Sequence, residues 1–266
     1  MPPDVRIARI ANFVTPVSGG LRTTLDELGA SYLAAGHEPV PVVPGPAGRD
    51  EQTGSWARAA VRNLVRVPLG VDLGTFSPGR FVAAVRARLA RPGELLLVHC
   101  GRLSREKRAD RSIRALAELR RRGLPAVPAV AGDGPLLGTL RARATGLPVR
   151  FLGHISERDV PARPLASAGV ALAPGPVGTF GPAALEALAS GTPVVVSHDS
   201  TLPEVAGPAG AAVDDDPAAC ATAILDLLGS RSRAAERARA ERYPWSAAVQ
   251  GFLRAHALIG KPASPR

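Results

Sequence analysis

The chain has 266 residues, enough for one large or two modest domains with a substantial core. Its formal net charge of +10 comes almost entirely from arginine, because lysine occurs only at positions 107 and 261. Aromatic residues make up only 4%, too few for base stacking, and no helix-turn-helix, zinc or ribonucleoprotein signature is present. The composition argues against a nucleic-acid partner. It fits an arginine-favouring genome, and it also suits a phosphate-bearing ligand or lipid head groups.

The two cysteines, Cys100 and Cys220, lie in apolar or Ala-rich segments, which indicates buried thiols in a reducing compartment. No apolar run reaches the length of a transmembrane helix. The N-terminal sequence MPPDVRIARIANFV carries charges where a signal peptide has a continuous apolar core. We therefore expect a cytoplasmic protein, and peripheral contact with a membrane is left open.

The N-terminal segment predicts a β-α-β unit. Residues 5–14 alternate as a strand, residues 21–33 carry apolar side chains at helical spacing, and residues 39–43 form a second strand. The chain then enters a polar, turn-rich stretch at 44–55. Because two parallel strands bury too little surface to be stable alone, part of this first unit is missing from the sequence.

From residue 94 onward, strands and helices alternate regularly. This pattern predicts right-handed β-α-β units in a doubly wound parallel sheet, an α/β fold whose ligand lies beyond the carboxyl ends of the strands. The expected strands are 94–101, 126–134, 149–155, 169–175 and 193–199, and the expected helices are 109–123, 136–146, 157–167 and 182–190, followed by a mostly helical tail at 217–260.

The loop GRLSREKR, residues 101–108, directly follows the strand that ends at Cys100. Arg102 and Lys107 would overhang the end of that strand, where a guanidinium and an ammonium group can neutralise a diphosphate. A solvated basic loop is the alternative. Because one of only two lysines in the chain stands here, we favour phosphate binding.

Three other turns are weaker candidates. In AGDGPL, Asp133 either stabilises the turn through its side chain or borders a ligand. In VRFLGHIS, Gly153 permits a close backbone approach, whereas His154 has the alternative of an ordinary loop histidine. In TPVSGGLRT, Gly19 and Gly20 allow the backbone to approach a phosphate, but a glycine pair alone is a weak signal.

The stretch GPVGTFGPAALEALASGTPVV, residues 175–195, predicts a Gly-rich turn and then a short helix from Pro182. The free amides and positive dipole end of this helix would form an anion site facing the basic loop. Glu186 lies one turn into the helix, where a carboxylate can accept two hydrogen bonds from a ribose diol. A helix carboxylate without a ligand is the alternative.

Taken in order, the motifs PVSGGLRT, VPLGVDLGTFSP, GRLSREKR, AGDGPL, FLGHIS and TFGPAALEALASGTPVV resemble the retaining family 4 glycosyltransferases. The resemblance runs from the first strand to RYPWSAAVQGFLRAH, and only the joint occurrence of the motifs is specific. It implies the GT-B architecture, in which two Rossmann-like domains flank a cleft. We expect an abbreviated N-terminal fragment at 1–66, a donor-binding domain at 67–241, and a crossover helix and tail at 242–266.

The resemblance implies transfer of a hexose from a nucleotide diphosphate sugar to an acceptor, with retained anomeric configuration. We therefore expect a mannose- or glucose-type donor linked to GDP or UDP, a lipid or small-molecule acceptor, and neither cofactor nor metal. The acidic run VDDDP at 213–217 is interpreted as a loop. By resemblance, Arg102 and Lys107 hold the diphosphate, Glu186 holds the ribose, Gly19 and Gly20 close on the phosphates, Gly153, His154 and Ile155 border the base, and Phe180 and Gly181 complete the donor site.

The sequence departs from the family pattern in the donor region. The family places an acid eight positions before Glu186 as a ligand of the sugar hydroxyls, and this chain has Gly178. Pro182 stands where an ordinary residue offers an N–H near the diphosphate. None of the five histidines matches the family's histidine near the donor sugar. A catalytically impaired nucleotide-binding remnant is therefore the alternative to an active enzyme.

Overall fold

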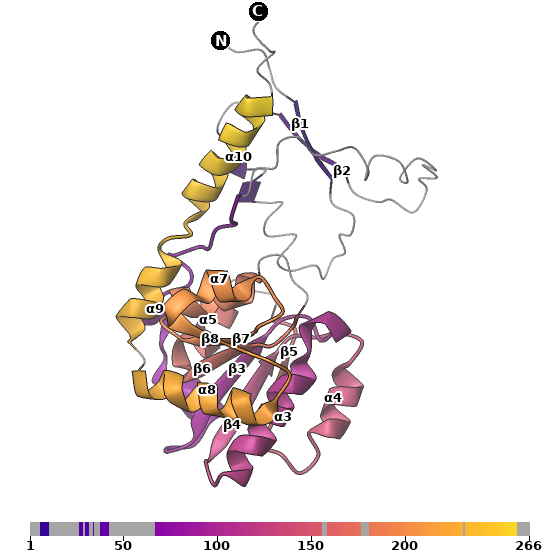
Figure 1. The fold of residues 1–266 in the computed structure, drawn as a ribbon, viewed down its shortest axis with the longest axis vertical. Coiled ribbons are helices and arrows are strands. Elements are labelled where there is room, and N and C mark those ends of the chain that lie inside the picture. Colours follow the sequence, from indigo (N-terminus) through magenta and orange to yellow (C-terminus); the bar gives the residue numbers. More distant parts are fainter. Residues whose placement is uncertain are drawn as a thin grey trace, which may run out of the picture. The chain divides into compact units, whose positions relative to one another are not determined.

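The computed structural model shows an α/β protein with a six-stranded parallel sheet (Figure 1). Its contacts divide the chain into two units, Val71–Pro244 and the combination of Met1–Gly70 with Trp245–Arg266. The structure describes residues 6–10, 27–28, 30–31, 34, 38–42, 67–155, 159–176, 181–230 and 232–259.

The sheet of the unit Val71–Pro244 has the strand order β5-β4-β3-β6-β7-β8. The chain builds outward from β3 to β5 and then returns to the other side of β3 with β6. In a doubly wound sheet this reversal is the topological switch point, beside which ligands bind at the carboxyl ends of the strands. The strands are β3 (Leu95–Cys100), β4 (Ala126–Ala131), β5 (Arg150–Gly153), β6 (Val170–Ala173), β7 (Val194–Ser197) and β8 (Gly210–Val213). The predicted doubly wound α/β fold is confirmed.

Helices cover both faces of this sheet (Figure 1). They are α2 (Ala83–Leu89), α3 (Ala109–Arg121), α4 (Leu137–Arg143), α5 (Asp159–Ser167), α6 (Pro182–Ala189), α7 (Leu202–Ala206), α8 (Pro217–Ser230) and α9 (Arg233–Ala240). Because successive side chains of a strand point to opposite faces, Leu96 and Val98 of β3 pack with α5 and α6, whereas Leu97 packs with α3 and α8. Both cores therefore fix β3 and the loop that follows it.

Three arginines of α9 bind backbone carbonyl groups, among them carbonyls at the ends of other helices. The contacts are Arg233 Nη2 to the carbonyls of Ala166 (2.6 Å) and Ser190 (3.3 Å), Arg237 Nη1 to those of Leu73 (3.0 Å), Phe76 (2.7 Å) and Ala189 (3.2 Å), and Arg239 Nε to that of Val205 (2.8 Å). The last carbonyls of a helix lack partners within it and form its negative end. The guanidinium groups thus cap α5, α6 and α7 and hold α9 against them.

In the other unit, β1 (Arg6–Ile10) and β2 (Glu38–Val42) pair in parallel. The described residues between them include helical positions, and Leu28 packs against Trp245, Val249, Phe252 and Leu253 of α10 (Trp245–Ile259). The predicted β-α-β opening is confirmed for the residues that the structure describes. Within those residues, no helix is long and apolar enough to cross a membrane.

Candidate functional site

The loops that follow β3, β4 and β5 are joined edge to edge by backbone hydrogen bonds. These run from Gly101 N to Ala131 O (2.9 Å), from Leu103 N to Asp133 O (2.9 Å) and from Gly132 N to Gly153 O (2.8 Å). A Cβ on Gly134 would lie 2.8 Å from Leu103 N, so this close approach requires glycine. The three strand ends therefore present one continuous backbone surface. Asp133 Oδ1 accepts from Gly134 N at 2.6 Å, which confirms the turn-stabilising interpretation.

The basic loop after β3 turns through a short 3-10 helix, Arg105–Lys107. Within it, Ser104 Oγ donates to Glu106 Oε1 at 2.5 Å, and this hydrogen bond lowers the pKa of Glu106. Arg102 is exposed and Lys107 is partly exposed. In the described part of the chain, no carboxylate lies within ion-pair distance of Lys107. Its ammonium group is therefore available to an anion.

The loop after β6 lies directly on the basic loop. A Cβ on Gly175 would meet the Glu106 carbonyl oxygen and would lie 3.1 Å from Lys107 Cα. Only a residue without a side chain permits this packing of backbone on backbone. The contact spans the switch point between β3 and β6, so the predicted phosphate-binding loop and the loop that leads to α6 form one structural unit.

The helix α6 begins at Pro182, as the sequence predicts. Gly181 precedes it with φ +59°, a left-handed conformation, and a Cβ there would lie 2.5 Å from Leu202 Cδ2. Glycine is thus required both by conformation and by space. This sharp entry sets the direction of the helix and places Glu186 in its second turn.

The residue Glu186 as a whole is partly exposed, but protein atoms surround its carboxyl group closely, and this burial raises its pKa to about 7. It lies close enough to Cys100, the last residue of β3, to act on it: burial raises the pKa of the Cys100 thiol, and the Glu186 charge raises it further. Among the described residues, no hydrogen bond or ion pair satisfies the Glu186 carboxylate. A carboxylate in such surroundings is stabilised by a ligand that donates hydrogen bonds to it.

His99 lies beneath the basic loop on β3. It is 2% exposed, its Nδ1 lies 3.0 Å from Ser112 Oγ of α3, and its Nε2 is buried without a hydrogen-bond partner in the described structure. Burial, and then the charge of Lys107, lowers the pKa of His99 to about 4. The imidazole is therefore neutral at physiological pH and serves to join β3 to α3.

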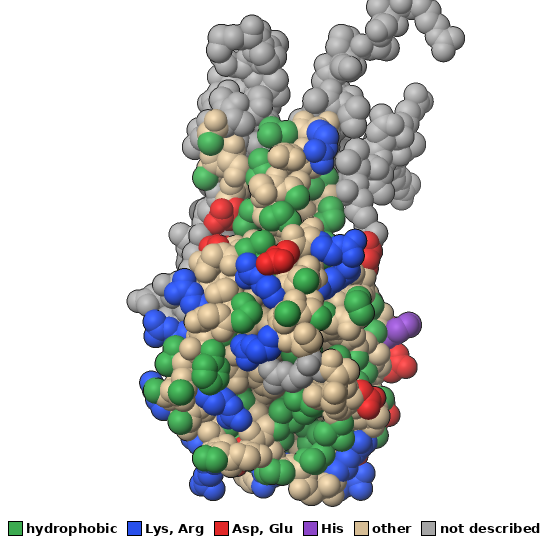
Figure 2. Space-filling view, turned by 90° about the vertical axis from the view of Figure 1, so that its left-hand side faces the viewer, with side chains coloured by type: hydrophobic (Ala, Val, Ile, Leu, Met, Phe, Trp, Pro, Cys, Tyr) green, Lys and Arg blue, Asp and Glu red, His purple; other side chains and the backbone are tan. Residues whose placement is uncertain are grey.

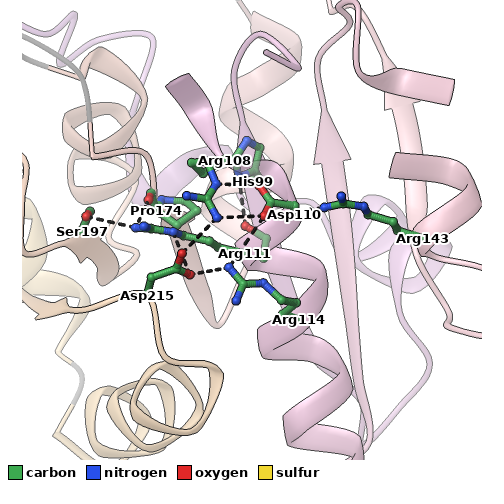
Figure 3. Close-up of polar contacts among 10 residues, drawn as sticks. His99, Arg108, Asp110, Arg111, Arg114, Arg143, Pro174, Ser197 and Asp215 are labelled. Atoms are coloured by element: carbon green, nitrogen blue, oxygen red, sulfur yellow. Dashed lines mark hydrogen bonds and ion pairs between the residues drawn. The ribbon is translucent and has the colours of Figure 1, made fainter. Parts of the chain in front are cut away.

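A charged network that sequence analysis did not identify lies at the same edge of the sheet (Figure 3). Asp215, in the loop after β8, faces three guanidinium groups from the start of α3, which we call the arginine cluster: Arg108, Arg111 and Arg114.

Asp216, the next residue of the acidic run, accepts from the amides of Ala218 (3.0 Å) and Ala219 (3.1 Å) and so caps α8. The acidic run is a loop, as expected, but two of its three carboxylates, Asp215 and Asp216, accept hydrogen bonds. In the described residues, no group of three His, Cys, Asp or Glu side chains could hold a metal ion.

The remaining predicted residues are placed as follows. Gly153 has φ +71° and is bonded to the turn after β4, His154 is exposed, and Ile155 is partly buried. Gly19, Gly20, Gly178 and Phe180 lie outside the described residues. Of the predicted residues, Arg102 and Lys107 follow the carboxyl end of β3, Gly153 ends β5, and Glu186 lies in α6, which follows β6.

Basic side chains are scattered over the surface. On the face shown in Figure 2, Lys and Arg are spread between hydrophobic and acidic groups and form no single basic stripe. The site is thus distinguished by its geometry: two cations lie beside close-packed glycine backbone, and a carboxylate whose pKa is raised by burial lies across the switch point. Cations suit a diphosphate and the carboxylate suits a diol, a combination found in a nucleoside diphosphate.

Comparison with known proteins agrees with this geometry. The model of the family described as Glycosyl transferases group 1 matches residues 94–230. A GDP-mannose-dependent alpha-(1-6)-phosphatidylinositol dimannoside mannosyltransferase of Mycobacterium tuberculosis is 37% identical, with 94% of this chain and 95% of that protein covered. Their alignment spans 363 positions and includes 94% of the 266 residues of this chain, about 250, so about 110 positions have no counterpart here. A phosphatidylinositol monomannoside mannosyltransferase of Mycolicibacterium smegmatis is 34% identical, with 74% and 56% covered.

Two solved structures share the fold. The Anabaena protein HepE, in complex with UDP and glucose, superimposes with a TM-score of 0.59 at 21% identity over 73% of this chain and 56% of that one. A glycosyltransferase from Rickettsia africae gives a TM-score of 0.76 at 12% identity over 98% of this chain and 100% of that one. At these identities, both likenesses concern the fold. On the match of the family model and the identity to the mycobacterial relatives, the chain belongs to the group 1 glycosyl transferases.

Proposed function

We propose that this enzyme transfers a mannosyl group from GDP-mannose to a mannosylated inositol phospholipid, with retention at the anomeric carbon. The donor and acceptor are those in the name of the 37% identical relative, of which 95% is covered. The observation that carries the proposal is the packing of the loop that leads to Glu186 on the loop of Lys107, together with a Glu186 carboxylate that has no hydrogen-bond partner among the described residues. One group suits the ribose of the donor and the other suits its diphosphate.

In the proposed reaction, the anomeric carbon forms a bond to an acceptor hydroxyl oxygen while its bond to the β-phosphate oxygen breaks. The hydroxyl proton is released, and GDP leaves with the negative charge. Arg102, Lys107 and the amino end of α6 would stabilise this charge. We propose that these groups take the place of a metal ion. Unchanged activity in excess EDTA supports this, and loss that Mg²⁺ or Mn²⁺ restores contradicts it.

The 37% identical relative has positions with no counterpart in this chain, and we propose that most of them belong to the N-terminal unit. Among the described residues of that unit, the sheet consists of β1 and β2 alone. The acceptor in the name of that relative is a phosphatidylinositol dimannoside, a lipid whose head group can enter an enzyme while its chains stay in the bilayer.

A catalytically impaired nucleotide-binding remnant is the second candidate, and Gly178 favours it. A glycine supplies no charged hydrogen bonds to the sugar hydroxyls. The enzyme is incubated with radiolabelled GDP-mannose and vesicles containing phosphatidylinositol mannosides, as the unmodified chain and as Gly178→Glu. Transfer by the unmodified chain, with product sensitive to α-mannosidase, supports the proposal. Nucleotide binding with transfer only by Gly178→Glu identifies a remnant, and transfer by neither contradicts the proposal.

A further inference from the structure

We propose that Asp215 is a positioning residue for donor binding: it anchors the arginine cluster and thereby holds the loop of Lys107 against the loop after β6. The inference rests on the proposed function, because it assigns Asp215 to the diphosphate-binding loop. Asp215 itself follows β8, three strands away from β3 in the sheet. Nothing in its sequence context, the run VDDDP, distinguishes it from its two neighbours.

The carboxylate of Asp215 is shared between three guanidinium groups (Figure 3). Its Oδ2 accepts from Arg108 Nη2 at 3.0 Å, and its Oδ1 lies 3.0 Å from Arg111 Nε and forms a short ion pair with Arg114 Nη2. Arg108 also donates through Nε (3.0 Å) and Nη2 (3.1 Å) to Asp110. Three cations are therefore held by two carboxylates, and Asp215 contacts every member of the cluster.

The arginine cluster is joined in turn to both loops of the site. Arg108 follows Lys107 directly and has φ +49°, a left-handed conformation that a residue other than glycine adopts only when its surroundings hold it there. Arg111 Nη1 donates to Pro174 O (3.0 Å) and to Ser197 Oγ (3.2 Å). Pro174 precedes Gly175, the residue that packs on Lys107. The network thus fixes both sides of the contact at the switch point.

Removal of Asp215 would leave this network with excess positive charge. The side chain of Arg111 is 11% exposed, and Asp215 is its only ion-pair partner among the described residues. A buried cation that loses its counterion is costly, and the structure relieves that cost by moving. We expect the start of α3 and the backbone at Lys107 to shift.

The neighbouring acid provides a matched control. Asp214 has a side chain that is 82% exposed, and it lies 3.9 Å from the exposed His198. Asp214→Asn removes the same charge one residue away without touching the arginine cluster. Asp215→Asn removes the charge and keeps the shape.

The test is calorimetric titration of GDP into the unmodified enzyme, Asp215→Asn and Asp214→Asn, well below each thermal midpoint. Loss of a negative charge near the site would by itself tighten binding of an anion. Positioning predicts the opposite, and a Kd about 3- to 30-fold higher for Asp215→Asn with Asp214→Asn unchanged is expected. A Kd for Asp215→Asn that is unchanged or lower overturns the positioning role.

Arg108→Gln provides a second test of the positioning role, which can also be made if Asp215→Asn folds poorly. Because Asp215 acts through Arg108, we expect this variant alone to raise the Kd for GDP, and the double variant to bind no worse than the weaker single variant. The inference is overturned if the two substitutions reduce the free energy of GDP binding additively, or if Arg108→Gln does not reduce it. If the unmodified enzyme binds GDP and the variants bind equally well, only the positioning role fails. If the unmodified enzyme binds no GDP, the proposed function fails with it.

Discussion

The backbone of Gly175 lies against the backbone of Lys107, with 3.1 Å between the position of a Cβ on Gly175 and Lys107 Cα. The first residue follows β6 and the second follows β3, the two strands between which the strand order reverses. Because no side chain separates the loops, the position of Lys107 depends on the loop that leads to Glu186.

Gly175→Ala is expected to weaken GDP binding. The added methyl group would displace the backbone at Glu106 and Lys107, and we expect a Kd about tenfold higher by calorimetry. Gly138→Ala is the matched control, because a Cβ at that position in α4 meets nothing within 4 Å. This control should leave GDP binding unchanged and stabilise the protein by about 0.5–1 kcal/mol. Unchanged GDP binding by Gly175→Ala would show that the loops move independently.

Glu186→Gln is expected to change the pH dependence of stability. Burial raises the pKa of Glu186 in the folded protein from 4.5 to about 7, so its ionisation opposes folding. The stability associated with the neutral acid is complete below pH 4.5 and is lost as the pH rises through 7. In urea unfolding, the free energy of unfolding of Glu186→Gln should increase relative to that of the unmodified chain between these pH values, by up to about 3 kcal/mol at pH 8. A difference that does not vary with pH would contradict this.

Donor affinity is expected to rise with pH through the same range. An ionised Glu186 accepts hydrogen bonds from both ribose hydroxyls, and the adjacent Cys100 thiol stays neutral because burial, and then the Glu186 charge, raises its pKa. GDP-mannose is the appropriate ligand, since its diphosphate is esterified at both ends and does not titrate near neutrality. Its Kd should fall between pH 6 and 8 for the unmodified chain and stay flat for Glu186→Gln. Parallel profiles would exclude Glu186 from the ribose site.

Arg237→Met is expected to destabilise the unit Val71–Pro244. The guanidinium donates to three carbonyl groups, at Leu73, Phe76 and Ala189, and the substitution would leave partly buried acceptors without donors. We expect a loss of about 2–4 kcal/mol in the free energy of unfolding. Arg121→Met is the control, because that side chain is 72% exposed and should contribute little. Equal effects of the two substitutions would show that the carbonyl contacts of Arg237 carry no stability.

The sequence predicted the strands β3, β4, β6 and β7 because their apolar runs are continuous, as is usual for strands buried on both faces. It did not predict β8, whose Gly-Ala-Ala-Val composition has low strand propensity and which lies at the edge of the sheet. The helices α2 and α7 were also missed, since each is under two turns long and shows no sustained periodicity.

The candidate site, like the fold, has residues that local sequence signals predict and residues that they do not. The positions of Lys107 and Glu186 follow from strand ends and helix starts, which are local signals. The role of Asp215 depends on contacts across three strands, which no local pattern shows. Its one trace in the sequence is the spacing of Arg108, Arg111 and Arg114, three residues apart at the start of α3, which places basic groups on one side of that helix.

The most direct test of a nucleotide diphosphate site at the switch point is titration of GDP into the unmodified chain and into Lys107→Met. Lys107 has no ion-pair partner among the described residues, so its replacement should remove a ligand contact and little stability. The expected result is binding of GDP by the unmodified chain and a Kd about 10- to 100-fold higher for Lys107→Met. Equal affinities, or no binding by the unmodified chain, would contradict the account.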